Sequence, residues 1–497
     1  MRNISEAIIK KNGNYPERVL QFGEGNFLRA FADWIIDEAN DKGDYQGSIV
    51  LCQPIAGGEV IVDMFESQNS IYTLAMRGIE DGKPVEKMKA ITSVSRCINA
   101  YRDYEALMAL AKSEALEVVI SNTTEAGIVY KEGDSMTDCP PSSFPAKVCV
   151  FLYERYKAFN GDIQKGLLFL PVELIETNGN ELKRIVLRYA EEWGLEEAFI
   201  RWMLEANKFA NTLVDRIVTG YPKIEKQYFT DKLGYEDNLL VTSEMFNLWV
   251  IEGKKEWLDI LPIHKGTPNV IWTEEVKPYK MRKVRILNGG HTSVVLAAYL
   301  AGYDIVLDLM RDPLFKKFLR DVIYHEIVPT IPMPEEELMT FAKAVEDRFS
   351  NPYIRHSLLD ISLNSCSKFL TRCLPSILSY IEIKKKLPKL LIFSMVGLIK
   401  FYDIKEKDGS YVGKREDGTE YIVKDDLEAL KFFEAVWKSR DPQKISHDVL
   451  ANEALWGGRN LLGIEGLEQS SAKLLQAFGD TSIRESLIKY MEEDLYE

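Results

Sequence analysis

The stretch Arg18-Val-Leu-Gln-Phe22-Gly23-Glu24-Gly25-Asn26-Phe27-Leu28-Arg29-Ala30 decides the fold of the first half of the chain. Its mostly apolar start predicts a short strand, and the two glycines after Phe22 predict a tight turn. Apolar residues then recur at helical spacing through Ala39, and Ser48–Cys52 predicts a second strand. A Gly-x-Gly turn in this strand, turn, helix, strand order is the setting in which a dinucleotide pyrophosphate is bound beside a helix N-terminus.

Two departures keep a second interpretation of this turn open. The third glycine of the usual dinucleotide pattern is replaced by Leu28, and Gln53 stands where an acid for the ribose hydroxyls is expected. A Gly-x-Gly alone is also common in tight turns that bind nothing. The local pattern favours a nucleotide site without excluding a simple turn.

Further strands and helices alternate along the first half of the chain. Leu116–Ser121 and Gly166–Glu173 predict buried strands, and polar residues follow the first of them at Asn122-Thr-Thr-Glu125. From about Glu275 helical periodicity dominates, apart from two Asp-Gly turns within residues 408–423 that predict a small surface hairpin. We therefore expect an α/β protein: a doubly wound, parallel-sheet domain over residues 1–275 and a mostly α-helical domain over residues 276–497.

The composition narrows the class of partner. The formal net charge of −14 argues against a nucleic-acid surface or an anionic membrane, so we expect a small-molecule substrate. The five histidines show no metal-ligand spacing, which predicts no metal site. Six scattered cysteines, no signal-peptide pattern and no long apolar run together predict a cytoplasmic protein.

The segment Lys283-x4-Asn288-x2-His291 is the candidate for catalysis. A lysine can exchange a proton with a hydroxyl or carbonyl group, and an asparagine N–H can stabilise the developing oxyanion. His291 could hold another substrate hydroxyl, and Asp215, if it lies nearby, could orient Lys283. In an α-helix Lys283 and Asn288 would point about 140° apart, so their convergence requires a break or a curved turn, which Asn288-Gly289-Gly290 could supply. The alternative is a solvated lysine, a turn or capping asparagine and an ordinary histidine at a helix start.

Several motifs in one order are similar to those of the mannitol dehydrogenase family. They are Gly23-x-Gly25-Asn26-Phe27-x-Arg29, Thr124-Glu125-x-Gly127, Val214-Asp-Arg-Ile217, Glu244-x-Phe-x-x-Trp-Val-Ile-Glu252, Lys283-x4-Asn288-x2-His291 and Arg348-Phe349-x-Asn351-Pro352 followed by Lys368. The resemblance covers nearly the whole chain. It implies an extended Rossmann domain followed by a helical domain, the cofactor NAD and no metal. It also implies Lys283 as general acid/base, Asn288 as oxyanion donor, and His291, Asp215 and Lys368 in the same pocket.

Other site residues follow from the same resemblance. The cofactor-binding residues expected are Gly23, Gly25, Asn26, Phe27, Arg29, Gln53, Thr124 and Glu125. Sugar-alcohol members carry Cys-Asp-Asn where this chain has Val172-Glu173-Leu174, and an arginine where it has Asp360. These changes resemble a branch of the family that reduces hexuronates.

A hexuronate would bring a carboxylate into the site. Arg355, His356, Lys368 and Arg372 are candidates to bind it, and the sequence does not choose among them. The sequence leaves open which hexuronate is reduced. Two alternatives also remain: a dehydrogenase of a sugar alcohol such as mannitol or arabinitol, and a nucleotide-binding sensor without turnover.

Overall fold

A computed structural model describes all of the chain except residues 1, 8–13, 81, 124–125, 268 and 493–497. The chain divides into two compact units. Unit 1 comprises Met1–Arg77 and Val85–Lys277, and unit 2 comprises Gly78–Pro84 and Pro278–Glu497. Each unit is described by itself below.

Unit 1 is built around a six-stranded parallel sheet in the order β6-β3-β2-β7-β8-β9. The sequence therefore runs outward from β2 to one edge and then from β7 to the other, so the strand order reverses between β2 and β7. This is the doubly wound topology of dinucleotide-binding domains, and it confirms the predicted fold class. The strands are β2 (Glu17–Phe22), β3 (Ser48–Gln53), β6 (Val94–Asn99), β7 (Val118–Ser121), β8 (Leu168–Pro171) and β9 (Lys208–Phe209).

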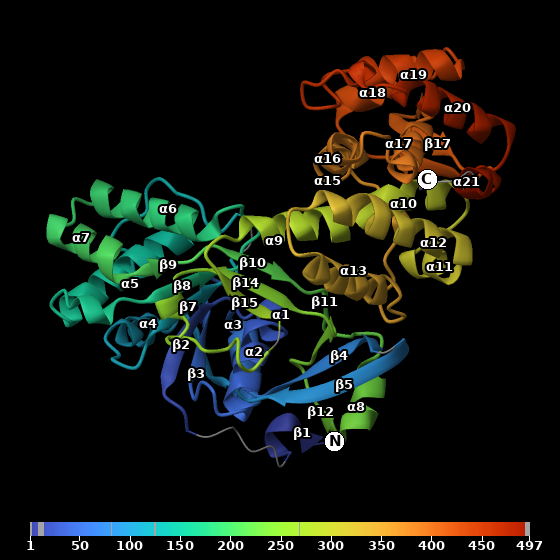
Figure 1. Ribbon diagram of the computed structural model, residues 1–497. Coiled ribbons are helices and arrows are strands. Elements are labelled where there is room, and N and C mark those ends of the chain that lie inside the picture. The colour runs from blue at the N-terminus through green and yellow to red at the C-terminus, as the bar shows by residue number, and fades with distance from the viewer. Residues whose placement is uncertain (1, 8–13, 81, 124–125, 268, 493–497) are drawn as a thin grey trace. The chain divides into compact units, whose positions relative to one another are not determined.

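Helices cover both faces of this sheet (Figure 1). Alternate strand residues point to opposite faces, so Val19 packs with α2 (Ala32–Asp41) and α3 (Glu59–Ser67), whereas Leu20 packs on the other side. The helices on that second side are α4 (Tyr104–Ala111), α5 (Phe144–Ala158), α6 (Asn178–Glu192) and α7 (Glu197–Ala206). Strands buried on both faces explain the continuous apolar runs in the sequence.

The helix expected directly after the glycine turn is interrupted. One turn, α1 (Asn26–Arg29), ends at Ala30, and α2 begins only at Ala32. The backbone carbonyls at this point accept tertiary hydrogen bonds instead of helical ones. Tyr72 donates its hydroxyl to the Arg29 carbonyl at 3.0 Å, and Arg216 donates Nη1 to the Ala30 carbonyl at 2.5 Å. These contacts account for the difference from the predicted single helix.

Two further sheets of unit 1 have the orders β11-β13-β4-β5 and β10-β14-β15. The long strands β4 and β5 were not predicted, because their alternation of polar and apolar residues is poor. The strand bounds are β4 (Tyr72–Glu80), β5 (Lys83–Ile91), β10 (Thr212–Asp215), β11 (Val218–Gly220), β13 (Val241–Glu244), β14 (Leu248–Glu252) and β15 (Val270–Thr273). The short β1 (Arg2–Asn3) pairs with β12 (Tyr235–Glu236), which follows α8 (Lys226–Leu233).

Unit 2 is mostly helical, as predicted. Its helices are α9 (Lys277–Arg282, whose first residue belongs to unit 1), α10 (Gly289–Leu300), α11 (Val306–Arg311), α12 (Pro313–Asp321), α13 (Glu335–Phe349), α14 (Leu358–Ile361), α15 (Ser365–Arg372), α16 (Leu374–Lys384), α17 (Lys389–Phe401), α18 (Leu427–Val436), α19 (Pro442–Ala451), α20 (Leu467–Asp480) and α21 (Ile483–Glu492). A small hairpin was expected at the two Asp-Gly turns. Instead, these turns connect the strands of a three-stranded sheet: β16 (Lys405–Lys407), β17 (Ser410–Lys414) and β18 (Glu420–Val423).

Two central helices of unit 2, α10 and α17, are buried on nearly all sides. Such helices are apolar all round, which is why their sequences lack a clear polar face. They approach closely at Gly397, where an added Cβ would lie 3.4 Å from the Cβ of Ala297. The packing of α17 therefore fixes the position of α10.

We predict that Gly397→Leu lowers the unfolding temperature, because its side chain has no room against Ala297. Overpacking of this kind costs on the order of 1–3 kcal/mol. Gly397→Ala is the matched control. Its methyl group fits at ordinary contact distance and alanine favours the helix, so its unfolding temperature should equal or exceed that of the wild type. Equal unfolding temperatures for the leucine and alanine variants, measured by differential scanning fluorimetry, would contradict this packing.

Candidate functional site

The carboxyl ends of β2 and β7 meet at the point where the strand order reverses. Asn122 donates its backbone N–H to the Phe22 carbonyl at 3.1 Å, and Gly23 donates to the Cys52 carbonyl at 2.9 Å. Gly23 has φ +114°, and a Cβ there would lie 3.0 Å from the Asn122 carbonyl oxygen. Only glycine fits this position. Open α/β sheets bind ligands at this edge.

The rest of the turn divides into an exposed part and a buried part. Gly25 and Asn26 are exposed, and a Cβ at Gly25 would meet no atom within 4 Å. Phe27 stacks on Phe31 with ring centroids 5.0 Å apart. Arg29 is buried, and its guanidinium donates to the Leu239 carbonyl and, at 2.7 Å, to Oδ1 of Asn26. Arg29 thus holds the turn from the buried side, while Gly25 and Asn26 remain exposed.

Gln53 and the segment after β7 complete this edge. The Gln53 side chain donates Nε2 to Oε1 of Glu24 at 2.7 Å. Thr124 and Glu125, both expected to bind the cofactor, lie outside the described residues. The adjacent Thr123 is held by Glu173, whose Oε1 accepts from the Thr123 backbone N–H at 2.9 Å and from its hydroxyl at 3.0 Å. Glu173 therefore holds Thr123, two residues after the end of β7.

In unit 2 the candidate catalytic segment forms a π-helix over Lys283–Asn288, between α9 and α10. The Gly289 N–H donates to the Val284 carbonyl, five residues earlier. In an α-helix the bonded residues i and i+4 share a face, and in a π-helix the bonded residues i and i+5 do so. Lys283 and Asn288 are five apart, so the wider turn brings their side chains to neighbouring directions. The break or curved turn expected at Asn288-Gly289-Gly290 is not found there, since the helix widens over Lys283–Asn288 and continues as α10 from Gly289.

The two glycines after Asn288 serve packing. A Cβ at Gly289 would lie 3.2 Å from the Arg372 carbonyl oxygen, and one at Gly290 would lie 3.0 Å from Cδ1 of Ile323. The absence of side chains at these two positions therefore leaves room for neighbouring elements. Gly289 also has a helical φ of −66°.

The cations that flank Lys283 in sequence are engaged elsewhere. Arg282 lies over the rings of Tyr279 and Phe341, with Cζ 5.0 and 4.5 Å from their centroids. Arg285 donates Nη1 to the Thr330 carbonyl at 3.0 Å. Both arginines thus anchor the π-helix to neighbouring elements.

His291, in the first turn of α10, stacks on Phe349 at 3.8 Å between centroids and lies perpendicular to His356 at 5.1 Å. Its Nε2 is buried and has no hydrogen-bond partner within the described part of the protein. Burial, followed by the charges of His356, Arg348, Arg372 and Lys368, holds the pKa of His291 well below its usual range. The ring is therefore neutral at physiological pH, and its buried nitrogen is available to a ligand hydroxyl.

Two of the four candidate carboxylate-binding residues lie one turn apart on α15. Lys368 donates Nζ to the Ile361 carbonyl at 2.8 Å, and Arg372 donates Nη1 to the Thr292 hydroxyl at 3.4 Å. Neither forms an ion pair with a carboxylate among the described residues. Arg355 is exposed, whereas His356 is in the histidine pair above. Burial lowers the pKa of both Lys368 and Arg372.

The structure thus gathers His291, His356, Lys368 and Arg372, with Arg348 and Phe349 as additional neighbours. The last two were not predicted as site residues, although the Arg348-Phe349 motif was present in the sequence. Asp215 ends β10 in unit 1, buried and opposite Leu248. Its proximity to Lys283 in unit 2 stays a prediction.

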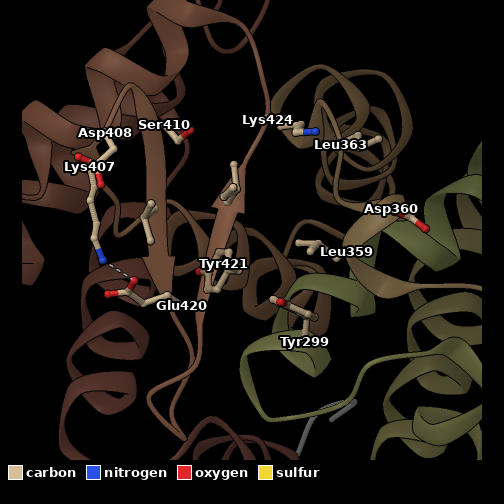
Figure 2. A pocket seen from close by; sticks show the side chains of 12 residues that line it. Tyr299, Leu359, Asp360, Leu363, Lys407, Asp408, Ser410, Glu420, Tyr421 and Lys424 are labelled. Atoms are coloured by element: carbon tan, nitrogen blue, oxygen red, sulfur yellow. Dashed lines mark hydrogen bonds and ion pairs between the residues drawn. The ribbon is translucent and has the colours of Figure 1, made fainter.

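A separate cavity of about 670 Å³ lies within unit 2, at the other end of α10 from His291. None of its lining residues is a predicted site residue. Figure 2 shows them: Tyr299, Leu359, Asp360, Leu363, Lys407, Asp408, Ser410, Val412, Glu420, Tyr421, Ile422 and Lys424.

The described residues contain neither a metal-binding cluster nor a membrane-spanning helix. No group of three or more histidine, cysteine, aspartate or glutamate side chains there is arranged to hold a metal ion. Likewise, no helix in the same residues is long and apolar enough to cross a membrane.

Comparison with known proteins covers almost the whole chain. Residues 17–263 match the family model described as the mannitol dehydrogenase Rossmann domain, and residues 275–460 match the mannitol dehydrogenase C-terminal domain. An altronate oxidoreductase of Yersinia enterocolitica is 42% identical over 96% of this chain and 97% of its own length. One from Escherichia coli O139:H28 is 43% identical over 95% and 96% of the two chains.

Two solved structures share the fold. A substrate-free D-sorbitol dehydrogenase superposes with a TM-score of 0.78 at 20% identity, covering 95% of each chain. The Pseudomonas fluorescens mannitol 2-dehydrogenase, in a ternary complex with NAD and D-mannitol, has a TM-score of 0.64 at 21% identity, covering 97% of this chain and 96% of that one. These values and the family matches confirm the resemblance seen in the sequence. The chain therefore belongs to the mannitol dehydrogenase family and is a dehydrogenase that acts on CH–OH groups.

Proposed function

We propose that this protein is an NAD(H)-dependent tagaturonate reductase that interconverts tagaturonate and altronate. The observation that carries the proposal is the similarity, at 42–43% identity over nearly the full length, to proteins named altronate oxidoreductase. The unpaired cations Lys368 and Arg372 near His291 support a substrate that carries a carboxylate. Fructuronate reductase and a mannitol or arabinitol dehydrogenase are the alternatives that the substrate test below separates.

The turn after β2 fits a bound dinucleotide. Gly23 permits the close approach to Asn122, and the open space above Gly25 allows a pyrophosphate to approach the backbone. The neighbouring structure of mannitol 2-dehydrogenase contains NAD, which makes NAD the cofactor proposed here. When bound, NADH supplies the hydride for reduction of the keto group.

Lys283 is the proposed general acid and base, without a metal. In reduction the carbonyl carbon receives the hydride, and the ammonium group of Lys283 donates a proton to the carbonyl oxygen, which becomes the product hydroxyl. In oxidation the neutral amine removes the hydroxyl proton as hydride leaves the carbon. The Asn288 side-chain N–H stabilises the negative charge on that oxygen. It can do so because the π-helix makes the side chains of Asn288 and Lys283 point in neighbouring directions. The buried Nε2 of neutral His291 binds a second substrate hydroxyl.

Among the candidates for the substrate carboxylate, Arg372 is favoured. Its guanidinium is half-buried and makes one long hydrogen bond, so most of its N–H donors have no partner in the described residues. Lys368 already donates to the Ile361 carbonyl, and Arg355 is exposed. A planar guanidinium also matches the two oxygens of a carboxylate.

The substrate is tested by steady-state oxidation of NADH with tagaturonate, fructuronate and fructose. We expect kcat/KM for tagaturonate to exceed that for either other substrate by at least about tenfold, because a polar site discriminates by unpaired hydrogen-bonding groups. A preference for fructuronate would assign the alternative hexuronate. A preference for fructose would contradict hexuronate specificity.

Lys283→Ala tests the mechanism. We predict a fall in kcat of at least about 10²-fold, the usual contribution of a positioned acid or base, with NADH affinity retained. Lys277→Ala is the control, because Lys277 is exposed at the start of α9 and makes no hydrogen bond shown in the structure. Near-wild-type turnover of Lys283→Ala would exclude the lysine mechanism. If the wild type itself binds NADH but reduces none of the three substrates, a nucleotide-binding sensor becomes the better description.

Arg372→Gln tests recognition of the carboxylate. We predict a loss of about 10- to 100-fold in kcat/KM for tagaturonate, since hydrogen bonds to charged groups contribute about 1.5–3 kcal/mol. Residual activity with neutral fructose should change little. Arg355→Gln removes a charge from an exposed position between α13 and α14 and serves as the control. Equal losses with tagaturonate and fructose would indicate a structural role for Arg372.

A further inference from the structure

The end of β3 lacks the acid that a dinucleotide domain usually places there. In domains of this strand order an aspartate or glutamate at the end of the second strand bonds the adenosine ribose hydroxyls of NAD, and an arginine nearby accommodates the 2′-phosphate of NADP. The last residue of β3 is Gln53, and no acid or base follows it until Glu59, in the first turn of α3. The position by itself therefore favours neither cofactor.

A carboxylate from the turn after β2 nevertheless lies beside the end of β3. Glu24 follows β2, and its Oε1 accepts a hydrogen bond of 2.7 Å from Nε2 of Gln53. The other end of the Gln53 amide accepts from the Ile55 backbone N–H at 3.1 Å. Gln53 is only 6% exposed, and a Cβ at Gly58 would lie 2.2 Å from its Nε2. The amide is thus clamped on both sides and fixes the Glu24 carboxylate at the end of β3.

The charge of Glu24 is not neutralised by a neighbouring cation. In the parts of the chain that the structure describes, no ion pair joins Glu24 to a lysine or arginine, although Arg29 attracts it at longer range. Burial raises the pKa of Glu24 above its usual value, because the carboxylate is partly removed from water. Such a group gains from additional hydroxyl donors.

Two other cations on this side of the sheet make hydrogen bonds of their own. Arg102, just after β6, donates to Asp63 and Glu66 of α3, in both cases at 2.9 Å. Lys147 is buried and donates Nζ to the Ser142 carbonyl at 2.8 Å. Neither is free to receive a phosphate without losing these bonds.

We propose that Glu24, positioned by Gln53, takes the place of the missing ribose acid and makes this dehydrogenase selective for NAD(H) over NADP(H). Its carboxylate accepts hydrogen bonds from the adenosine ribose hydroxyls, and its charge repels a 2′-phosphate. Gln53 is a positioning residue in this arrangement. The inference rests on the proposed function only in assuming that a nicotinamide dinucleotide binds at the turn after β2.

Glu24→Gln tests the inference, because glutamine keeps the shape and can still accept from Gln53 while it removes the charge. The measurement is the Kd of NADH and of NADPH, each by fluorescence titration of the full chain without substrate. We expect the wild type to bind NADH more tightly and the ratio of the NADPH Kd to the NADH Kd to fall at least about tenfold in the variant, in line with the loss of a charged hydrogen bond and of a repulsion.

Glu197→Gln is the matched control, since it removes one negative charge from an exposed position of unit 1 on α7. The ratio of the NADPH Kd to the NADH Kd in this variant should equal that of the wild type. Equality would show that a change in Glu24→Gln comes from the loss of charge at that position and not from the change in net charge. Gln53→Ala should lower the ratio less than Glu24→Gln, because the carboxylate remains but is no longer held.

The outcomes separate this inference from the proposed function. An unchanged ratio in Glu24→Gln, with normal NADH binding, overturns the role of Glu24 and leaves NAD use intact. A wild type that binds NADPH as tightly as NADH also overturns it. A wild type that binds neither dinucleotide contradicts the proposed function itself.

Discussion

The parallel pairing of β2 with β7 is the constraint on which unit 1 depends. It places Gly23 against the Asn122 carbonyl, at a distance and a backbone conformation that only glycine tolerates. The same pairing defines the point where the strand order reverses, so the turn after β2 and the loop after β7 share one edge. Glu173 then holds Thr123 in position. Its carboxylate is buried, and three hydrogen bonds from Ser121 and Thr123 offset part of the cost of burying it.

In unit 2 the corresponding constraint is the burial of α10. Packed against α17 and held at Gly289 and Gly290 by neighbouring elements, the helix cannot rotate to bring Asn288 under Lys283. The π-helix solves this by inserting extra backbone into one turn. Arg282 and Arg285 fasten the widened turn to Phe341 and Thr330. A locally less favourable helix is thus retained by its surroundings, at the residues proposed for catalysis.

Charge explains how one fold could serve a different substrate. The chain as a whole is acidic, with a formal charge of −14, yet Lys368 and Arg372 near His291 form no ion pair with a carboxylate in the described residues. An anionic substrate would supply the missing partner at this place. At the end of β3 the local charge has the opposite sign. Glu24 is a carboxylate without an ion-pair partner among the described residues, and Arg102 is bonded to Asp63. The two local fields favour different ligand charges within the same protein.

Residue patterns alone predicted much of the fold and of the candidate site, because apolar periodicity and glycine spacing depend on local backbone geometry. The Rossmann order of strands, the helical second half and the family motifs followed from short stretches such as Phe22–Arg29 and Lys283–His291. Tertiary packing decided what those patterns leave open. The break at Ala30–Phe31 arises from bonds to Tyr72 and Arg216, and the π-helix from the confinement of α10. The Glu24–Gln53 bond joins residues 29 positions apart, which spacing along a chain does not reveal. Contacts between distant segments depend on how strands and helices pack, and that is a property of the folded molecule.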